Sequence, residues 1–199
     1  RDLLRLAGAE NIRGSMYQDR AHVFVGWRTP LGTGIYDVLT QQWHTRGTLN
    51  SDTWRYTAIV TAGTRTFVAD ADGIFDELSR DYTSEHMADA STMGTEIVRE
   101  FTAIAPALPN RIAINTVRLE SAKGVGLAAG QGSDPIVRMR FSVDGGNTWS
   151  PWRDRPLGVQ GRYDQPTIWR RCGRAGRQDM VCWFSKSDPV KEAYRGVVI

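Results

Sequence analysis

Asp144 is the residue whose type and setting most readily suggest chemistry. It lies in the stretch FSVDGGNTWSPW, residues 141–152, between two runs of strand-forming residues. A carboxylate in this setting can serve as a general acid or as a metal ligand. An aspartate followed by two glycines can instead accept hydrogen bonds from nearby backbone N–H groups and form a tight turn. We expect the turn, because aspartate commonly bonds to its own local backbone.

The spacing around Asp144 is S-x-D-x-G-x-T-W, the spacing of the Asp-box, a small β-hairpin unit. Its residues are Ser142, Asp144, Gly146, Thr148 and Trp149. Glycine reaches positive φ without steric cost, and the threonine and tryptophan then resume a pleated strand. The elements that must position Asp144 are therefore two antiparallel strands joined at this turn.

Histidines offer weaker candidates for chemistry. His86 lies near Glu85 and Asp89 in the polar stretch 81–94, where a metal site is conceivable. A closed site needs more ligands than this stretch provides, so we expect a surface loop there. His22 and His44 stand alone inside strand patterns, and we expect them to have packing roles.

Common catalytic and nucleotide-binding motifs are absent from the sequence. It contains no G-x-S-x-G elbow, no H-E-x-x-H, no Cys-x-x-Cys and no P-loop. The glycine-rich stretch 124–135 lacks the G-x-G-x-x-G frame and a following helix, so it predicts a long flexible loop. We therefore predict no catalytic residue, no cofactor and no metal.

Carbohydrate chemistry is the alternative that the Asp-box keeps open. Sialidases carry this hairpin, but they repeat it and add an arginine triad with a tyrosine nucleophile. This chain has one box, and nothing in the spacing of Tyr163 or the arginines selects them. The seven tryptophans also suggest a carbohydrate-binding module, because exposed indoles stack on sugar rings; we expect all seven to be core residues instead.

Charge is distributed unevenly along the chain. Residues 1–105 have a net charge of −4 and residues 106–199 a net charge of +7. A basic half can face a polyanion such as DNA. The alternative is that its arginines occupy solvent-facing strand positions and pair with nearby acids. The candidates for DNA contact are Arg153, Arg155, Arg162, Arg170, Arg171, Arg174 and Arg177.

Two cysteines in 199 residues argue against a scaffold built on disulfides. Cys172 and Cys182 lie symmetrically about a turn near Arg177, so they can face each other across a hairpin. We expect two reduced, buried thiols. No apolar run approaches the ~20 residues of a membrane helix, and no charged-then-apolar leader opens the chain, so neither a membrane segment nor a secretion signal is expected.

Short strand patterns recur from Ala21 to the end of the chain at intervals of about 8–12 residues, which is typical of all-β folds. The segment APALPN, residues 105–110, is the best linker, and the charge changes sign there. We therefore predict an all-β chain with two domains: antiparallel, propeller-like strands over 1–105, and a β-sandwich carrying the Asp-box over 106–199.

An ordered series of motifs resembles a known family. AGQGSDPIVRMRFSVDGGNTWS is followed by PLGVQGRY, IWRRCGR and SKSDPVK, and upstream by TFVADADGIFDEL and DYTSE. The series is similar to the C-terminal part of the packaged-DNA stabilisation proteins of short-tailed bacteriophages and related prophages, over most of residues 36–199. Two positions depart from the pattern: Cys172 replaces an aliphatic residue, and Pro166 precedes the strand that holds Trp169.

The resemblance implies a structural virion protein of the tail hub or nozzle. Its copies would form a homo-oligomeric ring below the portal, close the channel and retain packaged double-stranded DNA until ejection. Portal, adaptor and tail needle proteins would be its partners. Its location would be the virion, and the host bacterial cytoplasm before assembly.

Overall fold

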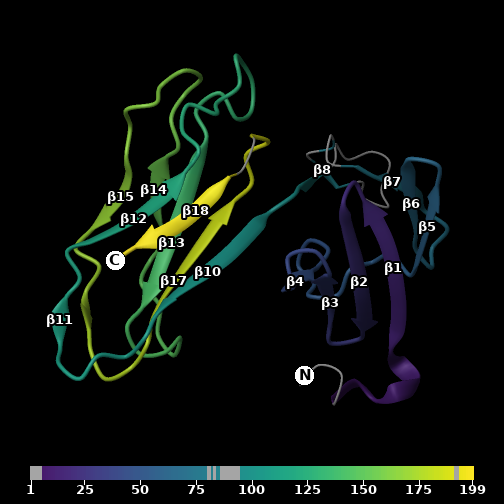
Figure 1. The fold of residues 1–199 in the computed structure, drawn as a ribbon, viewed down its shortest axis with the longest axis horizontal. Helices are drawn as coiled ribbons and strands as arrows, with labels where there is room; N and C mark the ends of the chain where they lie inside the picture. The colour runs from purple at the N-terminus through teal and green to yellow at the C-terminus, as the bar shows by residue number, and fades with distance from the viewer. Residues whose placement is uncertain (1–5, 80–81, 83, 86–94, 191–192) are drawn as a thin grey trace. The chain divides into compact units, whose positions relative to one another are not determined.

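The computed structural model describes residues 6–79, 82, 84–85, 95–190 and 193–199, and nearly all its regular structure is β (Figure 1). The one helical element with assigned bounds is a single 3-10 turn, η1 (Ala9–Asn11). None of the described helices is long and apolar enough to cross a bilayer. The prediction of an all-β chain is confirmed. The chain divides into two compact units, Arg1–Thr95 and Glu96–Ile199.

The first unit contains an antiparallel meander of four strands, each paired with the next along the chain. The strands are β1 (Arg13–Asp19), β2 (His22–Thr29), β3 (Gly32–Asp37) and β4 (Gln42–Arg46). Tyr17, Phe24 and Ile35 point to one face and form a buried cluster. Four-stranded meanders of this kind are the units of β-propellers. That the first unit is part of a propeller stays a prediction.

A second, three-stranded antiparallel sheet completes most of the first unit. It consists of β5 (Ala58–Ala62), β6 (Arg65–Ala69) and β7 (Phe75–Leu78), and a two-stranded pair follows, β8 (Ser84–Glu85) with β9 (Thr95–Glu96). Trp54, Tyr56 and Val68 form its buried cluster. Ile59 and Leu78 pack against this cluster and also against that of the meander, so the two sheets share one apolar interior.

The second unit has two main sheets around one large core. The first sheet has the order β10 (Arg99–Ala105), β17 (Met180–Lys186), β13 (Ile136–Ser142), β14 (Arg153–Pro156). The other has the order β15 (Thr167–Arg170), β12 (Thr116–Ser121), β18 (Tyr194–Val198), and β11 (Ile112–Ala113) pairs with β16 (Arg174–Ala175). Figure 1 shows β10, β17 and β13 side by side.

Side chains from both main sheets meet in a single buried cluster, as in a β-sandwich. Val117 and Trp169 come from the β12 sheet, and Met139 and Phe184 from the β13 sheet; each is fully buried. Trp169 packs edge-to-face on Phe184 with ring centroids 5.6 Å apart. The indole N–H of Trp169 donates to the carbonyl of Arg153 at 2.7 Å, so the largest core side chain is also satisfied as a hydrogen-bond donor.

The division between the units lies about ten residues before the position that the sequence suggests. We predicted a boundary near residue 106, but β10 pairs with β17 along its whole length, from Arg99 opposite Lys186 to Ala105 opposite Met180. The proline-rich linker is therefore inside the second unit. Its residue Ala107 donates its N–H to Asp179 Oδ1 at 2.8 Å. Prolines mark the end of a strand, but they do not show where that strand finds its partner.

Candidate functional site

The Asp-box hairpin joins β13 to β14, and its centre is a network of short hydrogen bonds around Asp144. Oδ1 of Asp144 accepts the hydroxyl of Ser142 at 2.6 Å and the backbone N–H of Thr148 at 2.8 Å. Oδ2 accepts the hydroxyl of Thr148 at 2.6 Å. Ser142 Oγ in turn accepts the N–H of Gly146, whose φ of 97° favours glycine. The carboxylate is thus committed to the turn on both oxygens.

These bonds hold Asp144 as an anion. The hydroxyls of Ser142 and Thr148 and the Thr148 N–H lower the pKa of Asp144 from 3.8 to about 2. A general acid working near neutral pH needs a raised pKa instead. The geometry is that of a turn-forming carboxylate, and it leaves Asp144 without the properties of a proton donor.

The outer face of the β13 sheet, away from the core, carries a cluster of one arginine and three tryptophans. The guanidinium carbon of Arg140 lies 4.2 Å from the ring centroid of Trp183 and 4.8 Å from those of both Trp149 and Trp152. Trp149 and Trp152 belong to the Asp-box segment, whereas Trp183 lies opposite Arg140 on β17. We call these four residues the arginine–tryptophan cluster.

The cluster connects the Asp-box hairpin to the sheet. Trp149 and Trp152 both meet Trp183 edge-on, with centroids 5.4 and 6.3 Å apart, and the Arg140 cation lies among the three rings. Each cation–π contact contributes roughly 0.5–2 kcal/mol, more when it is shielded from water. The turn at Asp144 thereby fixes the position of Trp149 and Trp152 against Trp183 on β17, a strand far along the chain from the turn.

Two of the arginines predicted to face DNA use their donors inside the protein. Arg153 donates to the carbonyls of Arg170 and Arg171. Arg155 Nε donates to the carbonyl of Ile168 at 2.8 Å. These bonds link β14 of one sheet to β15 of the other and to the residue that follows it. Arg153 and Arg155 therefore contribute to the sandwich itself.

The other predicted arginines lie on the surface: Arg162, Arg170, Arg171, Arg174 and Arg177. Arg162 Nε is 3.7 Å from Asp164 Oδ1, and both side chains are exposed. Their contact with DNA stays a prediction. Arg140 was not among the candidates. The alternation of β13 nevertheless indicates that Arg140 shares the outer face with Arg138, whereas Met139 points to the other face, into the core.

The tryptophans are not uniformly buried. Trp54 and Trp169 are core residues, but the prediction of seven core tryptophans is wrong for the other five. Besides the arginine–tryptophan cluster, Trp43 on β4 is 62% exposed. Its ring lies 5.2 Å from that of Trp27 and 5.0 Å from that of Tyr36. We call Trp27, Tyr36 and Trp43 the aromatic face of the first unit.

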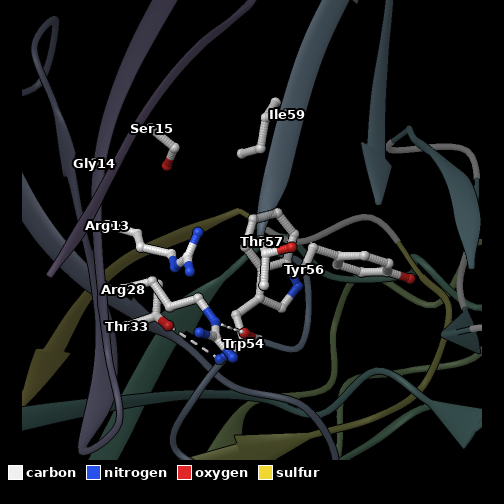
Figure 2. Close-up of a pocket in the computed structure, with 9 residues that line it drawn as sticks. All are labelled: Arg13, Gly14, Ser15, Arg28, Thr33, Trp54, Tyr56, Thr57 and Ile59. Carbon is white, nitrogen blue, oxygen red and sulfur yellow. Dashed lines mark hydrogen bonds between the residues drawn. The ribbon is translucent and has the colours of Figure 1, made fainter. Parts of the chain in front are cut away.

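A cavity in the first unit lies between the start of β1 and the segment 54–59. Figure 2 shows the two bonds that frame it: Arg28 Nε donates to the carbonyl of Trp54 at 2.8 Å, and the Trp54 N–H donates to Thr33 Oγ1 at 3.0 Å. Its volume is about 10 Å³, close to the minimum for one water molecule. It is too small for a substrate.

Of the three histidine candidates, His22 and His44 lie in the part of the chain that the structure describes. His22 Nδ1 lies 2.7 Å from Asp37 Oδ2. Burial opposes the charge on Asp37, but hydrogen bonds from Thr40 and His22 outweigh it and lower the pKa of Asp37 to about 2. Burial and the nearby Arg46 lower the pKa of His44.

His86 and Asp89 lie outside the described residues, whereas Glu85 is described, and burial raises its pKa. Over the described part of the chain, no group of three or more His, Cys, Asp or Glu side chains is placed to hold a metal ion.

Cys172 and Cys182 are free, fully buried thiols in the same core cluster. Burial raises the pKa of both, that of Cys182 to about 12 with a further contribution from Cys172. A thiol held protonated in this way is a poor nucleophile.

Comparison with known proteins adds little beyond this geometry. No family model matches the chain, and no curated protein matches it. Among solved structures, it is similar to an exo-β-1,3-galactanase from Phanerochaete chrysosporium, crystallised with galactose, at 10% identity and a TM-score of 0.28. The match covers 94% of this chain but 56% of the galactanase chain. A similarity this low establishes neither a common fold nor a common activity.

Proposed function

We propose that this chain is a structural, non-enzymatic component of a bacteriophage tail. It forms part of the ring below the portal that closes the channel and retains packaged DNA until ejection. The support is the ordered motif series between Gly130 and Lys191, together with the structural use of its residues. Copies of the protein would be its first partners, followed by portal, adaptor and tail needle proteins.

Two residues of the motif series, Asp144 and Lys186, make their hydrogen bonds within the chain. Asp144 is saturated by Ser142 and Thr148. Lys186 is 4% exposed and donates to the carbonyl of Val190 at 3.2 Å. Such bonds explain why these residue types occur together in a framework protein.

The direct test is assembly. The protein is mixed with purified portal and adaptor rings, and the mixture is imaged by electron microscopy. We expect ring-shaped density below the adaptor, absent when the protein is omitted. Repeated failure to add density to portal–adaptor complexes, with folded protein at micromolar concentration, would contradict the proposal.

Carbohydrate binding is the second candidate function, and the aromatic face favours it. Trp43 exposes most of its indole beside Trp27 and Tyr36, which is the arrangement on which sugar rings stack. Glycan-array binding that is lost in Trp43→Ala and kept in Trp152→Ala would raise this candidate above the first. Hydrolysis requires its own test with a fluorogenic sialoside. Turnover by the unaltered protein, abolished in Tyr163→Phe, would support a sialidase-like enzyme.

A further inference from the structure

The guanidinium of Arg140 has hydrogen-bond donors that the protein does not use. Nε of Arg140 is enclosed and has no acceptor among the residues that the structure describes. The two terminal nitrogens are not enclosed in this way, and the described residues provide no acceptor for them either. An arginine carries five N–H donors in a rigid fork. The open end of that fork therefore faces solvent with its donors free.

The three indoles keep this cation in place without neutralising it. Ring faces stabilise a guanidinium electrostatically, and three rings at 4.2–4.8 Å fix its orientation. A carboxylate partner would satisfy the donors, but tryptophan accepts no ordinary hydrogen bond. Arg140 is thus oriented before any ligand arrives, which lowers the entropic cost of binding an anion.

Among the described strand residues of this face, no acidic side chain shares the row of Arg140. Arg138 lies two residues earlier on the same face, and its Nε is 3.7 Å from Asp154 Oδ1, with both side chains about half exposed. Glu100 lies two strands away, opposite Ser185, which itself lies opposite Arg138. Among the strand residues of this face, the two acidic side chains are therefore in the row of Arg138, and Trp183 separates Arg140 from β10. The Asp144 anion lies beyond Ser142 in the turn, where Ser142 and Thr148 engage both of its carboxylate oxygens.

We propose that Arg140 binds a phosphate group of DNA, with Arg138 as an adjacent second contact. Guanidinium forks bind phosphate oxygens through two parallel N–H bonds. The surrounding charge favours an anionic partner, since residues 106–199 have a net charge of +7 and the sequence pI is about 9.1. This inference rests on the proposed function, which brings duplex DNA next to the protein.

The test measures binding of a fluorescein-labelled 20-base-pair duplex by anisotropy across a sodium chloride series. We expect Arg140→Gln to weaken binding roughly tenfold and Arg138→Gln to weaken it less, because Asp154 already engages Arg138. Each lost phosphate contact should reduce the slope of log K against log salt by about 0.9. Arg118→Gln is the matched control: its side chain is 48% exposed, against 51% for Arg138, and it also contacts one acid, but from the other sheet.

Because Arg140 also holds the tryptophans, its variant must be shown to fold, by near-ultraviolet circular dichroism. A folded Arg140→Gln variant with unchanged affinity and salt slope would overturn the inference. If the variant does not fold, the test uses the tryptophan fluorescence of the unaltered protein. Phosphate bound at Arg140 must change the emission of the surrounding indoles. Saturation with duplex without any such change would also overturn the inference.

Two competitors identify the source of the anion. Inorganic phosphate should compete weakly at millimolar concentration, and polyglutamate of matched charge should compete poorly. Equal competition by polyglutamate would indicate that the site binds an acidic protein segment rather than DNA, and would contradict the proposal. Ring assembly by Arg140→Gln, imaged with portal and adaptor, separates the two claims: rings without Arg140-dependent DNA binding would refute this inference alone.

Discussion

Asp144 and Thr148 bind each other twice, through the Thr148 backbone N–H at 2.8 Å and its hydroxyl at 2.6 Å, one bond to each carboxylate oxygen. This pair closes the turn that brings Trp149 and Trp152 over Arg140. A residue that looks catalytic in the sequence is therefore a structural centre, and its effects should appear in stability.

Removing the Asp144 carboxylate should destabilise the second unit. Asp144→Ala leaves the Thr148 N–H and the Ser142 hydroxyl without their acceptor, and it loosens two of the three indoles around Arg140. We expect a melting temperature several degrees lower, with a smaller decrease for Asp144→Asn, whose amide oxygen can still accept a bond. Scanning calorimetry measures both. A melting temperature unchanged in Asp144→Ala would refute the structural role.

Acid should remove part of the same stabilisation. The pKa of Asp144 is about 2 in the folded chain and about 3.9 in unfolded chains, so the folded state prefers the ionised form. Its contribution is complete above about pH 4 and is lost as the pH falls toward 2. Urea titrations of the unaltered protein and Asp144→Asn at pH 5, 4, 3 and 2 should therefore converge as the pH decreases. Because Asp37 titrates in the same direction, only the difference between the two proteins is diagnostic.

We expect that replacing Arg155 lowers the stability of the fold, whatever its effect on DNA binding. Its Nε bond to the Ile168 carbonyl joins the two sheets, so Arg155→Ala should lower the free energy of unfolding by about 1–3 kcal/mol. Arg174→Ala, at an exposed position, should change it by less than about 0.5 kcal/mol. Chemical denaturation of both variants checks this. Equal stability of the two, with DNA binding reduced only in Arg155→Ala, would restore the role predicted from the sequence.

The position of the domain boundary can be tested by truncation. A polypeptide of residues 96–199 keeps β10 and should fold alone, with the stacked rings of Phe101 and Phe184, 4.8 Å apart, in place. A polypeptide of residues 106–199 lacks β10 and exposes the backbone edge of β17, so we expect it to aggregate or to lose its near-ultraviolet circular dichroism. Cooperative unfolding of the shorter polypeptide with similar stability would place the boundary at 106 after all.

Local features were predictable from the sequence because they depend on neighbours along the chain. The alternation of Val137 and Met139 with Arg138 and Arg140 indicates a half-buried strand, and the structure buries the first pair. Asp-Gly-Gly indicates a turn, and both glycines have positive φ. The general expectation that tryptophan is a core residue failed at Trp43, because nothing local shows which face of a strand another part of the chain will cover.

The β class, the hairpin at Asp144 and the alternating faces of β13 follow from the order of residues along the chain. The pairing of β10 with β17, the bond from Arg155 to Ile168 and the contact of Trp183 with Arg140 emerge only in the folded chain. The two groups of features differ because they depend on interactions of different range. Turn propensity and side-chain alternation depend on a few consecutive residues, whereas strand pairing and cation–π contacts depend on the register between segments that lie tens of residues apart.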